Sequence, residues 1–305
     1  MTPDFAAVDW GTSGFRLWLM GFDGQVHGES RGPEGMAHCI TAGFAPVLDA
    51  HLKRAGAGPG LRVLICGMAG ARQGWVEAPY ATLPAEVGLL AARAVRLDVS
   101  MAGDRDIRIL PGLAQRDPDA PDVMRGEETQ LLGIASDGIE GLVCMPGTHC
   151  KWAWLRRGAV TGFKSYMTGE LFDLLRQHSI LRHAMPEQGH VSPDSPAFVA
   201  ALDQAIADPA ILPGALFGLR AGGLLEFARP DEALARLSGL LIGAEVGAEA
   251  ARHAAGDITL VGQDGLGALY AAALARAGYR PNITDADAAS RRGLLAAATE
   301  IWGER

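Results

Sequence analysis

The residues best suited to chemistry lie near the N-terminus, in the stretch DWGTSGFR that runs from Asp9 to Arg16. Asp9 stands directly before a turn of small residues, in which Gly11 is followed by the hydroxyls of Thr12 and Ser13. Backbone N–H groups in such a turn can face one concavity, and glycine lets an anion approach the backbone closely. Asp9 would repel a bare phosphate, so the acid indicates a cation between them, and Mg²⁺ is the natural choice. We therefore predict a phosphate-binding turn beside which Asp9 holds Mg²⁺, directly or through water.

A second turn of the same kind, PGTHCK, follows near the middle of the chain. Gly147, Thr148 and His149 form its bend, and two of the three lysines of the chain, Lys151 and Lys164, come shortly after it. Taken alone, the first turn is equally well explained as an ordinary hairpin, and for the second turn an ordinary hairpin is the favoured explanation. A single lysine is usually a solvated surface residue. The repetition at matched points of two half-chains favours a function, because two phosphate-binding turns would hold a nucleoside triphosphate.

The elements that must position these turns follow one pattern twice: strand, small-residue turn, strand, turn, strand. We expect strands at 5–10, 15–21, 25–30, 61–66, 107–110, 141–145, 151–155, 159–163 and 258–262, and helices at 43–56, 84–97, 127–135, 169–180, 196–207, 214–228, 231–254, 266–277 and 286–302. The polar, proline-rich segment 115–122 is expected to be a loop. The sequence thus predicts an α/β protein with an N-terminal domain at 1–136 and a C-terminal domain at 137–305.

Composition narrows the classes of function. The chain has 305 residues, 49% of them hydrophobic, and a net charge of −8, so nucleic acid is not an expected partner. Its N-terminus lacks the features of a signal peptide and no apolar run is long enough to span a membrane, so we expect a cytoplasmic protein. The four cysteines show no CxxC spacing, and we expect them reduced, without structural zinc. The chain also lacks the GxxxxGK(S/T) motif of P-loop kinases.

The same residues resemble a known superfamily. DWGTSGFR and MPGTHCKW are similar to the first and second phosphate motifs of the sugar kinases, acetate kinase, actin and Hsp70, and ITLVGQDGLGALYAAAL resembles their adenosine motif. More narrowly, GMAGARQGWVEAPY, ILPGL, DVMRGEETQLLG, PGTHCKW and SYMTGELFDLL resemble, in this order, the 2-dehydro-3-deoxygalactonokinase family. The resemblance implies two ribonuclease-H-like (actin-like ATPase) α/β domains with a nucleotide cleft between them.

The reaction that the resemblance implies is transfer of the γ-phosphoryl group of ATP, with Mg²⁺, to the terminal C6 hydroxyl of 2-dehydro-3-deoxy-D-galactonate, in the catabolism of galactonate and galactose. The implied partners are this sugar acid and ATP, with no nucleic acid and no membrane. The sequence leaves the oligomeric state open, a homodimer included. Phosphoryl transfer needs in-line positioning, charge neutralisation and a base near the attacking hydroxyl.

The resemblance assigns the base to the start of the helix at 127–135. Glu127 and Glu128 are both candidates, and alignment with the kinase pattern favours Glu127, although many sugar kinases have Asp here. The alternative is that both acids only complement the helix dipole. The expected phosphate ligands are Gly11, Thr12, Ser13, Gly147, Thr148, His149 and Lys151. His149 could instead contact the substrate or only form the turn. Arg16 is a further candidate, although an arginine on a strand is more often a surface residue.

The substrate carries a carboxylate, which arginine binds well. The loop GMAGARQGW follows a buried strand, so Arg72, Gln73 and Trp75 are the expected substrate-binding residues. The alternative is an exposed arginine beside a packing tryptophan. Arg125 and Arg116 are weaker candidates.

The adenosine motif places Gly262 and Gly265 beside the nucleotide, with Gly243 and Glu245 as weaker candidates. Three rival functions remain. The glycines of VGQDGLG superficially resemble those of a dinucleotide-binding unit, but their spacing is GxxGxG rather than GxGxxG. A non-metabolic ATPase of the actin or Hsp70 type shares the architecture. A kinase of another 2-keto-3-deoxy sugar acid, or of a hexose, would share the phosphate motifs, and the sequence does not fix the stereochemistry of the substrate.

Overall fold

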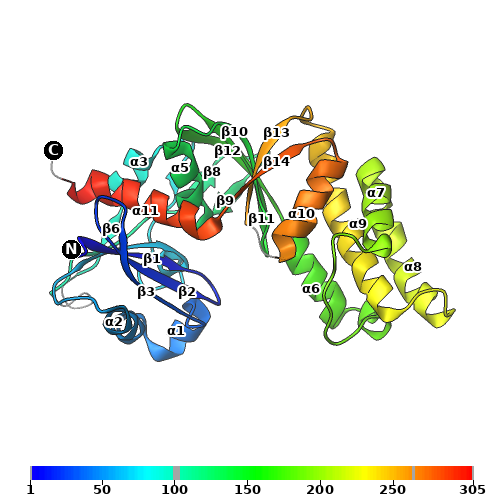
Figure 1. Ribbon diagram of the computed structural model, residues 1–305, viewed down its shortest axis with the longest axis horizontal. Coiled ribbons are helices and arrows are strands. Elements are labelled where there is room, and N and C mark those ends of the chain that lie inside the picture. Colours follow the sequence, from blue (N-terminus) through cyan, green and yellow to red (C-terminus); the bar gives the residue numbers. More distant parts are fainter. Residues whose placement is uncertain (1, 99–103, 263–264, 304–305) are drawn as a thin grey trace. The chain divides into compact units, whose positions relative to one another are not determined.

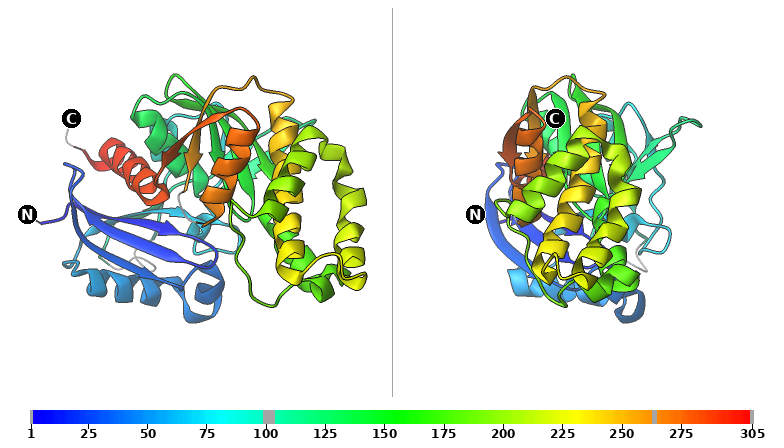
Figure 2. Two further views of the ribbon diagram at one scale, coloured as in Figure 1. Left: turned by 45° about the vertical axis from the view of Figure 1, so that its right-hand side comes forward. Right: turned by 90° about the vertical axis from the view of Figure 1, so that its right-hand side faces the viewer.

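The computed structural model describes residues 2–98, 104–262 and 265–303, and the chain divides into two compact units. Unit 1 comprises Met1–Glu140, Ala153–Phe163 and Ala286–Arg305, and unit 2 comprises Gly141–Trp152 and Lys164–Asp285. Figures 1 and 2 show both units as sheets covered by helices. Gln263 and Asp264 of the adenosine motif lie outside the described residues.

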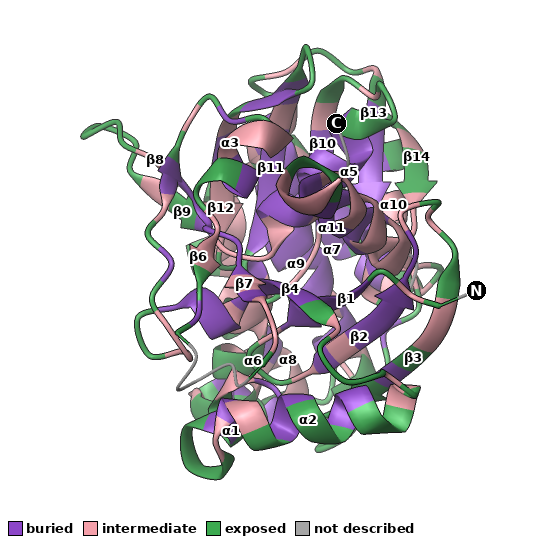
Figure 3. Cartoon of the chain, turned by 90° about the vertical axis from the view of Figure 1, so that its left-hand side faces the viewer, coloured by how far each residue is buried: buried purple, intermediate pink, exposed green. Residues whose placement is uncertain are grey.

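The sheet of unit 1 has the strand order β3-β2-β1-β4-β7-β6. Its strands are β1 (Phe5–Trp10), β2 (Phe15–Met20), β3 (Val26–Gly32), β4 (Arg62–Gly67), β6 (Val95–Arg96) and β7 (Ile107–Ile109). β1 pairs antiparallel with β2 and parallel with β4, and every residue of β1 is buried, as Figure 3 shows by colour. Because β1 is buried on both faces, its residues form a near-continuous apolar run, and Asp9 is the one acid in it.

Helices cover both faces of this sheet. The unit contains α1 (Met36–Ala42), α2 (Phe44–Ala55), α3 (Val87–Ala92), α5 (Glu127–Ser136) and α11 (Ala286–Trp302), the 3₁₀ helix η1 (Met68–Gly70), and a small sheet of order β5-β8-β9 made of Ala81–Thr82, Leu113–Gln115 and Asp122–Met124. α2 ends at Gly56, which has the left-handed φ of 85° that glycine adopts readily. α5 and α11 pack closely through glycines, because a methyl group at Gly293 would overlap the Thr129 carbonyl oxygen.

The second sheet has the order β12-β11-β10-β13-β14, formed by Gly141–Met145 (β10), Cys150–Arg156 (β11), Ala159–Tyr166 (β12), Asp257–Val261 (β13) and Arg280–Thr284 (β14). The two sheets share one strand order. In the first, β1 lies between its hairpin partner β2 and the parallel strand β4, and in the second, β10 lies between its hairpin partner β11 and the parallel strand β13. This shared order confirms the repeat that the sequence predicted and the two ribonuclease-H-like α/β folds.

The helices of unit 2 are α6 (Thr168–His178), α7 (Pro196–Ala207), α8 (Leu212–Leu224), α9 (Pro230–Ala250) and α10 (Gly265–Arg276), with 3₁₀ helices η2 (Ile180–Ala184) and η3 (Pro209–Ile211). α7, α8 and α9 lie side by side in Figures 1 and 2. A methyl group at Gly243 would overlap the backbone and side chains of α7 at Leu202 and Ala205. Gly243 therefore allows α9 to pack closely on α7.

Several expected elements differ from those observed. The helix expected at 84–97 is only Val87–Ala92, because Val95 and Arg96 pair with β7 at the sheet edge. The expected loop 115–122 begins and ends inside the strands β8 and β9, which pair with each other. The expected helix 214–228 ends at Leu224, and the sequence did not predict α1 or β14.

The predicted division into 1–136 and 137–305 also differs from the two units. The last helix, α11, is grouped with unit 1, because it packs on α5 and on the strands β1 and β4. No helix among the described residues is long and apolar enough to cross a bilayer.

Candidate active site

The first candidate site is the end of β1 in unit 1, where Asp9 is 5% exposed. Asp9 Oδ2 accepts hydrogen bonds from Arg16 Nη2 at 2.7 Å and from Ser290 Oγ at 2.9 Å. Burial raises the pKa of Asp9, while the charge of Arg16 and the Ser290 hydrogen bond oppose that rise. Asp9 is thus a carboxylate held in one orientation by its own hairpin and by α11.

Arg16 connects two acids. Its Nη1 lies 2.5 Å from Asp287 Oδ1, and Asp287 Oδ2 also accepts from Arg31 Nη1 at 2.6 Å. These arginines lower the pKa of Asp287 against the effect of its burial. Sequence reasoning found Arg16 but missed its partners in α11, because Asp287 and Ser290 follow Asp9 by more than 270 residues and carry no local signal.

Backbone hydrogen bonds fix the small-residue turn after Asp9, both within the turn and from α1. Gly11 N donates to Gly14 O at 2.9 Å, and the residues between them, Thr12 and Ser13, are exposed. The first backbone N–H groups of α1 donate to the carbonyls of this turn, with Met36 N 2.9 Å from Gly11 O. The turn therefore presents two hydroxyl side chains on a fixed backbone, as a phosphate-binding turn requires.

The two acids at the start of α5 have different environments. Glu127 is partly exposed, and its Oε2 accepts from Arg125 N at 3.1 Å. Glu128 is fully buried, and its carboxyl accepts from Gly126 N at 2.6 Å and from the Thr129 hydroxyl at 2.9 Å. Burial, and next the charge of Glu127, raise the pKa of Glu128 to about 8, so this carboxyl is mostly protonated at neutral pH. Only Glu127 of the pair reaches solvent as a candidate base.

The predicted substrate loop lies between η1 and β5 in unit 1. Arg72 and Gln73 are exposed there, whereas Trp75 stacks on Phe44 with ring centroids 5.9 Å apart. Trp75 also meets Trp10 edge to face at 6.2 Å, so the ring packs against the core of the unit.

The weaker candidates are occupied in other ways. Arg125 Nη2 donates to Ala78 O at 2.8 Å, and its guanidinium lies 4.5 Å from the centroid of Tyr80. Arg116 Nε donates to Thr82 Oγ1 at 3.2 Å on the surface. Arg125 thereby joins the start of α5 to the predicted substrate loop.

The second candidate site is a pocket of about 360 Å³ in unit 2, a size typical of small-molecule sites. Gly147 and Thr148 of the second turn form one wall, the N-terminus of α6 the next, and α9 and the start of α10 the others. The lining residues are Gly147, Thr148, Thr168, Gly169, Phe172, Asp173, Gly189, His190, Val191, Leu234, Ser238, Leu241, Ile242, Gly265, Leu266, Leu269 and Tyr270. Its glycine-rich end beside a helix N-terminus suits phosphate, and its apolar side suits a planar base.

The structure brings some predicted residues into this pocket and places others beside it. Gly147, Thr148 and Gly265 line the pocket. His149 Nε2 lies 2.5 Å from Glu170 Oε2 on the surface, and Lys151 is buried with its Nζ donating to the His149 carbonyl at 3.1 Å. Gly262 has a φ of 112° and closes the end of β13.

Lys164, the other lysine near the second turn, pairs within unit 2. Its Nζ lies 3.4 Å from the buried Glu249 and 4.7 Å from the ring centroid of Tyr166. An internal ion pair of this kind accounts for Lys164 without a bound anion.

Comparison with known proteins decides the family. The profile described as 2-keto-3-deoxy-galactonokinase matches residues 9–297. The chain belongs to this family. It is 51% identical, over 98% of its length and 97% of the relative, to a Rhizobium meliloti (strain 1021) protein named probable 2-dehydro-3-deoxygalactonokinase. It is 35% identical, over 99% of both chains, to the 2-dehydro-3-deoxygalactonokinase of Escherichia coli (strain K12).

A solved structure supports the same assignment. The crystal structure of a Sinorhizobium meliloti protein assigned to the same activity shares 50% sequence identity and superposes with a TM-score of 0.92. The match covers 98% of this chain and 100% of the other. The kinase family and the fold that the sequence motifs predicted are therefore confirmed.

Proposed function

We propose that this chain transfers the γ-phosphoryl group of ATP to the C6 hydroxyl of 2-dehydro-3-deoxygalactonate. The observation that supports this most is the family match over residues 9–297, together with relatives of that name that align over nearly their whole length. The galacto configuration follows the names of the relatives. We propose a cytoplasmic location, because an enzyme of this kind needs ATP and a metabolite as its substrates.

The nucleotide occupies the pocket of unit 2 in this proposal. Its base lies against the apolar side chains of α9 and α10, near Gly265, and its phosphates reach the turn at Gly147 and Thr148. Backbone N–H groups at the start of α6 favour negative charge there. The first turn, Gly11 to Ser13, supplies hydroxyl and backbone donors for the transferred phosphoryl group.

Glu127 is the proposed base. The C6 hydroxyl attacks the γ-phosphorus, Glu127 accepts the hydroxyl proton, and the bond to the bridging oxygen of ADP breaks. Glu127 suits the role because it is the partly exposed member of the acidic pair. Glu128 is fully buried and accepts from Gly126 N, so it orients the start of α5 rather than touching substrate.

Mg²⁺ is the proposed metal, and Asp9 the residue that would hold it through water. Both hydrogen bonds that the described residues make to Asp9 go to Oδ2, so we assign the contact to Oδ1. A carboxylate oxygen is the ligand type that Mg²⁺ prefers. The ion neutralises charge on the phosphates when bound. Arg16 pairs with Asp9 and Asp287, and these contacts hold its guanidinium beside the same turn.

The carboxylate of the sugar acid is proposed to bind the exposed side chains of Arg72 and Gln73. A bidentate arginine contact would separate sugar acids from neutral sugars. Trp75 anchors the loop that carries Arg72 and Gln73, because its ring stacks on Phe44.

The test is ADP release by the purified protein with ATP, Mg²⁺ and five acceptors: 2-dehydro-3-deoxygalactonate, its gluconate epimer, galactonate, galactose and glycerol. We expect turnover on the first acceptor well above the rest. Preferred turnover on another member would move the substrate assignment to that compound while keeping the phosphate sites. ATP binding with no acceptor turned over would refute the kinase proposal and favour an ATPase of the actin or Hsp70 type. The Asp9→Asn variant is the control for contaminating kinases.

A further inference from the structure

A buried carboxylate stands behind the wall of the unit 2 pocket. Glu245 of α9 is 3% exposed and lies outside the set of described residues that line the pocket. Its Oε1 accepts a hydrogen bond from Trp152 Nε1 at 2.8 Å. Its Oε2 accepts from Tyr270 OH at 2.7 Å and from the Thr168 hydroxyl. These donors belong to β11, α10 and α6, so one side chain joins four elements.

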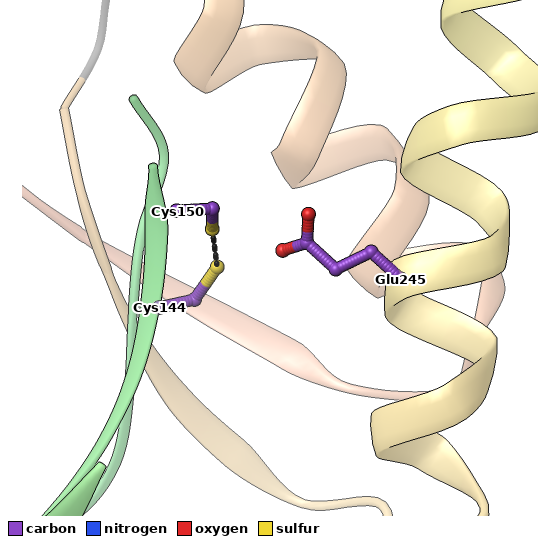
Figure 4. Close-up of side chains that lie close together, drawn as sticks. All are labelled: Cys144, Cys150 and Glu245. Atoms are coloured by element: carbon purple, nitrogen blue, oxygen red, sulfur yellow. Dashed lines mark hydrogen bonds between the residues drawn. The ribbon is translucent and has the colours of Figure 1, made fainter. Parts of the chain in front are cut away.

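Two thiols extend this arrangement, as Figure 4 shows. Cys144 Sγ lies 4.0 Å from Cys150 Sγ, and the two sulfurs and the nearest carboxylate oxygen of Glu245 all lie within 4.8 Å of one another. Cys144 belongs to β10 and Cys150 starts β11, so they flank the turn that carries Gly147 and Thr148. Both ends of the turn therefore place a thiol beside Glu245. We call this set the Glu245 cluster: Cys144, Cys150, Trp152, Thr168, Glu245 and Tyr270.

Two thiols and a carboxylate whose ligand atoms lie within 4.8 Å of one another also match a soft-metal site. The cluster is better explained by hydrogen bonding. Burial raises the pKa of both thiols, and a metal requires thiolates. The Glu245 oxygens already accept from an indole and two hydroxyls, and a metal would have to displace some of these donors.

The cluster reaches the pocket through two of its donors. Thr168 and Tyr270 both line the pocket, and each directs its hydroxyl to Glu245. Next to Thr168, Gly169 packs so closely on the turn that a methyl group there would meet the Gly147 backbone, and Glu170 N donates to Thr148 O at 3.0 Å. Glu245 therefore sets the positions of the turn, the α6 N-terminus and α10 together.

We propose that Glu245 is a positioning residue for the nucleotide: it fixes the second turn, Thr168 and Tyr270 in the binding geometry before ATP arrives. This inference rests on the proposed function, since it takes ATP to occupy the unit 2 pocket. Preorganised contacts strengthen binding by reducing the entropy lost on association. Removing the carboxylate should then weaken ATP binding more than it slows the chemical step, because the proposed base Glu127 is unchanged.

The test is Glu245→Gln, which keeps the size of the side chain but turns one acceptor into a donor that faces other donors. We expect the KM for ATP, and the Kd of a non-hydrolysable ATP analogue measured by calorimetry, to rise about tenfold. The kcat and the KM for the sugar acid should change less than about threefold. Tyr270→Phe removes a single donor, should raise the analogue Kd about threefold, and gives the measurement if Glu245→Gln does not fold.

Glu249→Gln is the matched control. Glu249 lies one turn later on α9, is 0% exposed, and accepts from Tyr166 OH outside the pocket lining. Its variant should lose stability but leave the analogue Kd unchanged. An unchanged analogue Kd in Glu245→Gln, or an equal rise of that Kd in Glu249→Gln, would overturn the positioning role of Glu245 but not the proposed function. A wild-type protein that binds no analogue would overturn the proposed function as well.

Discussion

Glu128 gives the folded protein a pH dependence whose sign and size can be worked out. Its carboxyl is fully buried and its pKa is raised from 4.5 to about 8. The folded chain therefore holds this proton more tightly than the unfolded chain does. Stability from this group is fully present below about pH 4.5 and is lost as the pH rises towards about 8. A pKa unit corresponds to about 1.4 kcal/mol, so the loss amounts to about 5 kcal/mol.

Glu128→Gln should remove this loss. The amide oxygen can accept from Gly126 N and the amide nitrogen can donate to the Thr129 hydroxyl, so the variant keeps two contacts without a titrating group. We expect the variant to be similar to the wild type near pH 4.5, and more stable by several kcal/mol near pH 8. The measurement is urea-induced unfolding at steps between about pH 4.5 and pH 8.5, compared as the difference between variant and wild type at each pH.

Glu127→Gln is the matched comparison on the same helix turn. The charge of Glu127 is the second cause of the raised pKa of Glu128, so removing it should reduce the pH dependence without abolishing it. A difference between Glu128→Gln and the wild type that stays constant across this pH range would show that the buried carboxyl does not hold its proton. That result would refute the reasoning and reopen Glu128 as a candidate base.

Three further predictions concern the site and the fold. Asp9→Asn should lower kcat by about a hundredfold or more with an unchanged circular dichroism spectrum, and an unchanged kcat would remove Asp9 from the mechanism. Arg72→Ala should raise the KM for the sugar acid at least tenfold with kcat changed less than about threefold, whereas an unchanged KM would exclude Arg72 as the carboxylate ligand. Gly293→Ala should destabilise the protein by about 1–3 kcal/mol in urea unfolding, because its methyl group overlaps the Thr129 carbonyl oxygen. Gly88→Ala is the control, because its methyl group meets open space and should not lower the free energy of unfolding. The exposed Gly138 does not serve as a control, because its φ of 75° would strain an alanine.

The sequence predicted the elements that repeat and missed those that depend on distant partners. Both strand–turn–strand openings were found because apolar alternation and small-residue turns are local signals. The helix expected at 84–97 was too long because Val95 and Arg96 pair with β7, a contact that propensity does not encode. β14 was missed for a similar reason, since its residues are largely exposed and it is defined by pairing with β13.

The candidate site shows the same limit. The motifs located Asp9, the two turns and the acidic pair, but residue types alone did not separate Glu127 from Glu128. Burial separates them, and burial is a property of the packed helix. Trp75 illustrates the converse, because the sequence offered substrate contact and core packing as alternatives and the structure shows its ring stacked on Phe44.

The acids near the two turns have different hydrogen-bond partners, and the repeat in the sequence does not predict this difference. In unit 1, the acid beside the turn is held by Arg16 and by Ser290 of α11, and Arg16 is in turn held by Asp287. In unit 2, the acid lies behind the turn, where Glu245 receives neutral donors and no cation among the described contacts. In the first case a guanidinium stands at a fixed place near the turn, with its charge balanced by Asp9 and Asp287, whereas in the second case neutral donors fix the geometry without a cation. The first arrangement suits a turn where phosphoryl charge must be neutralised, and the second suits a turn that must keep its shape while a nucleotide enters and leaves.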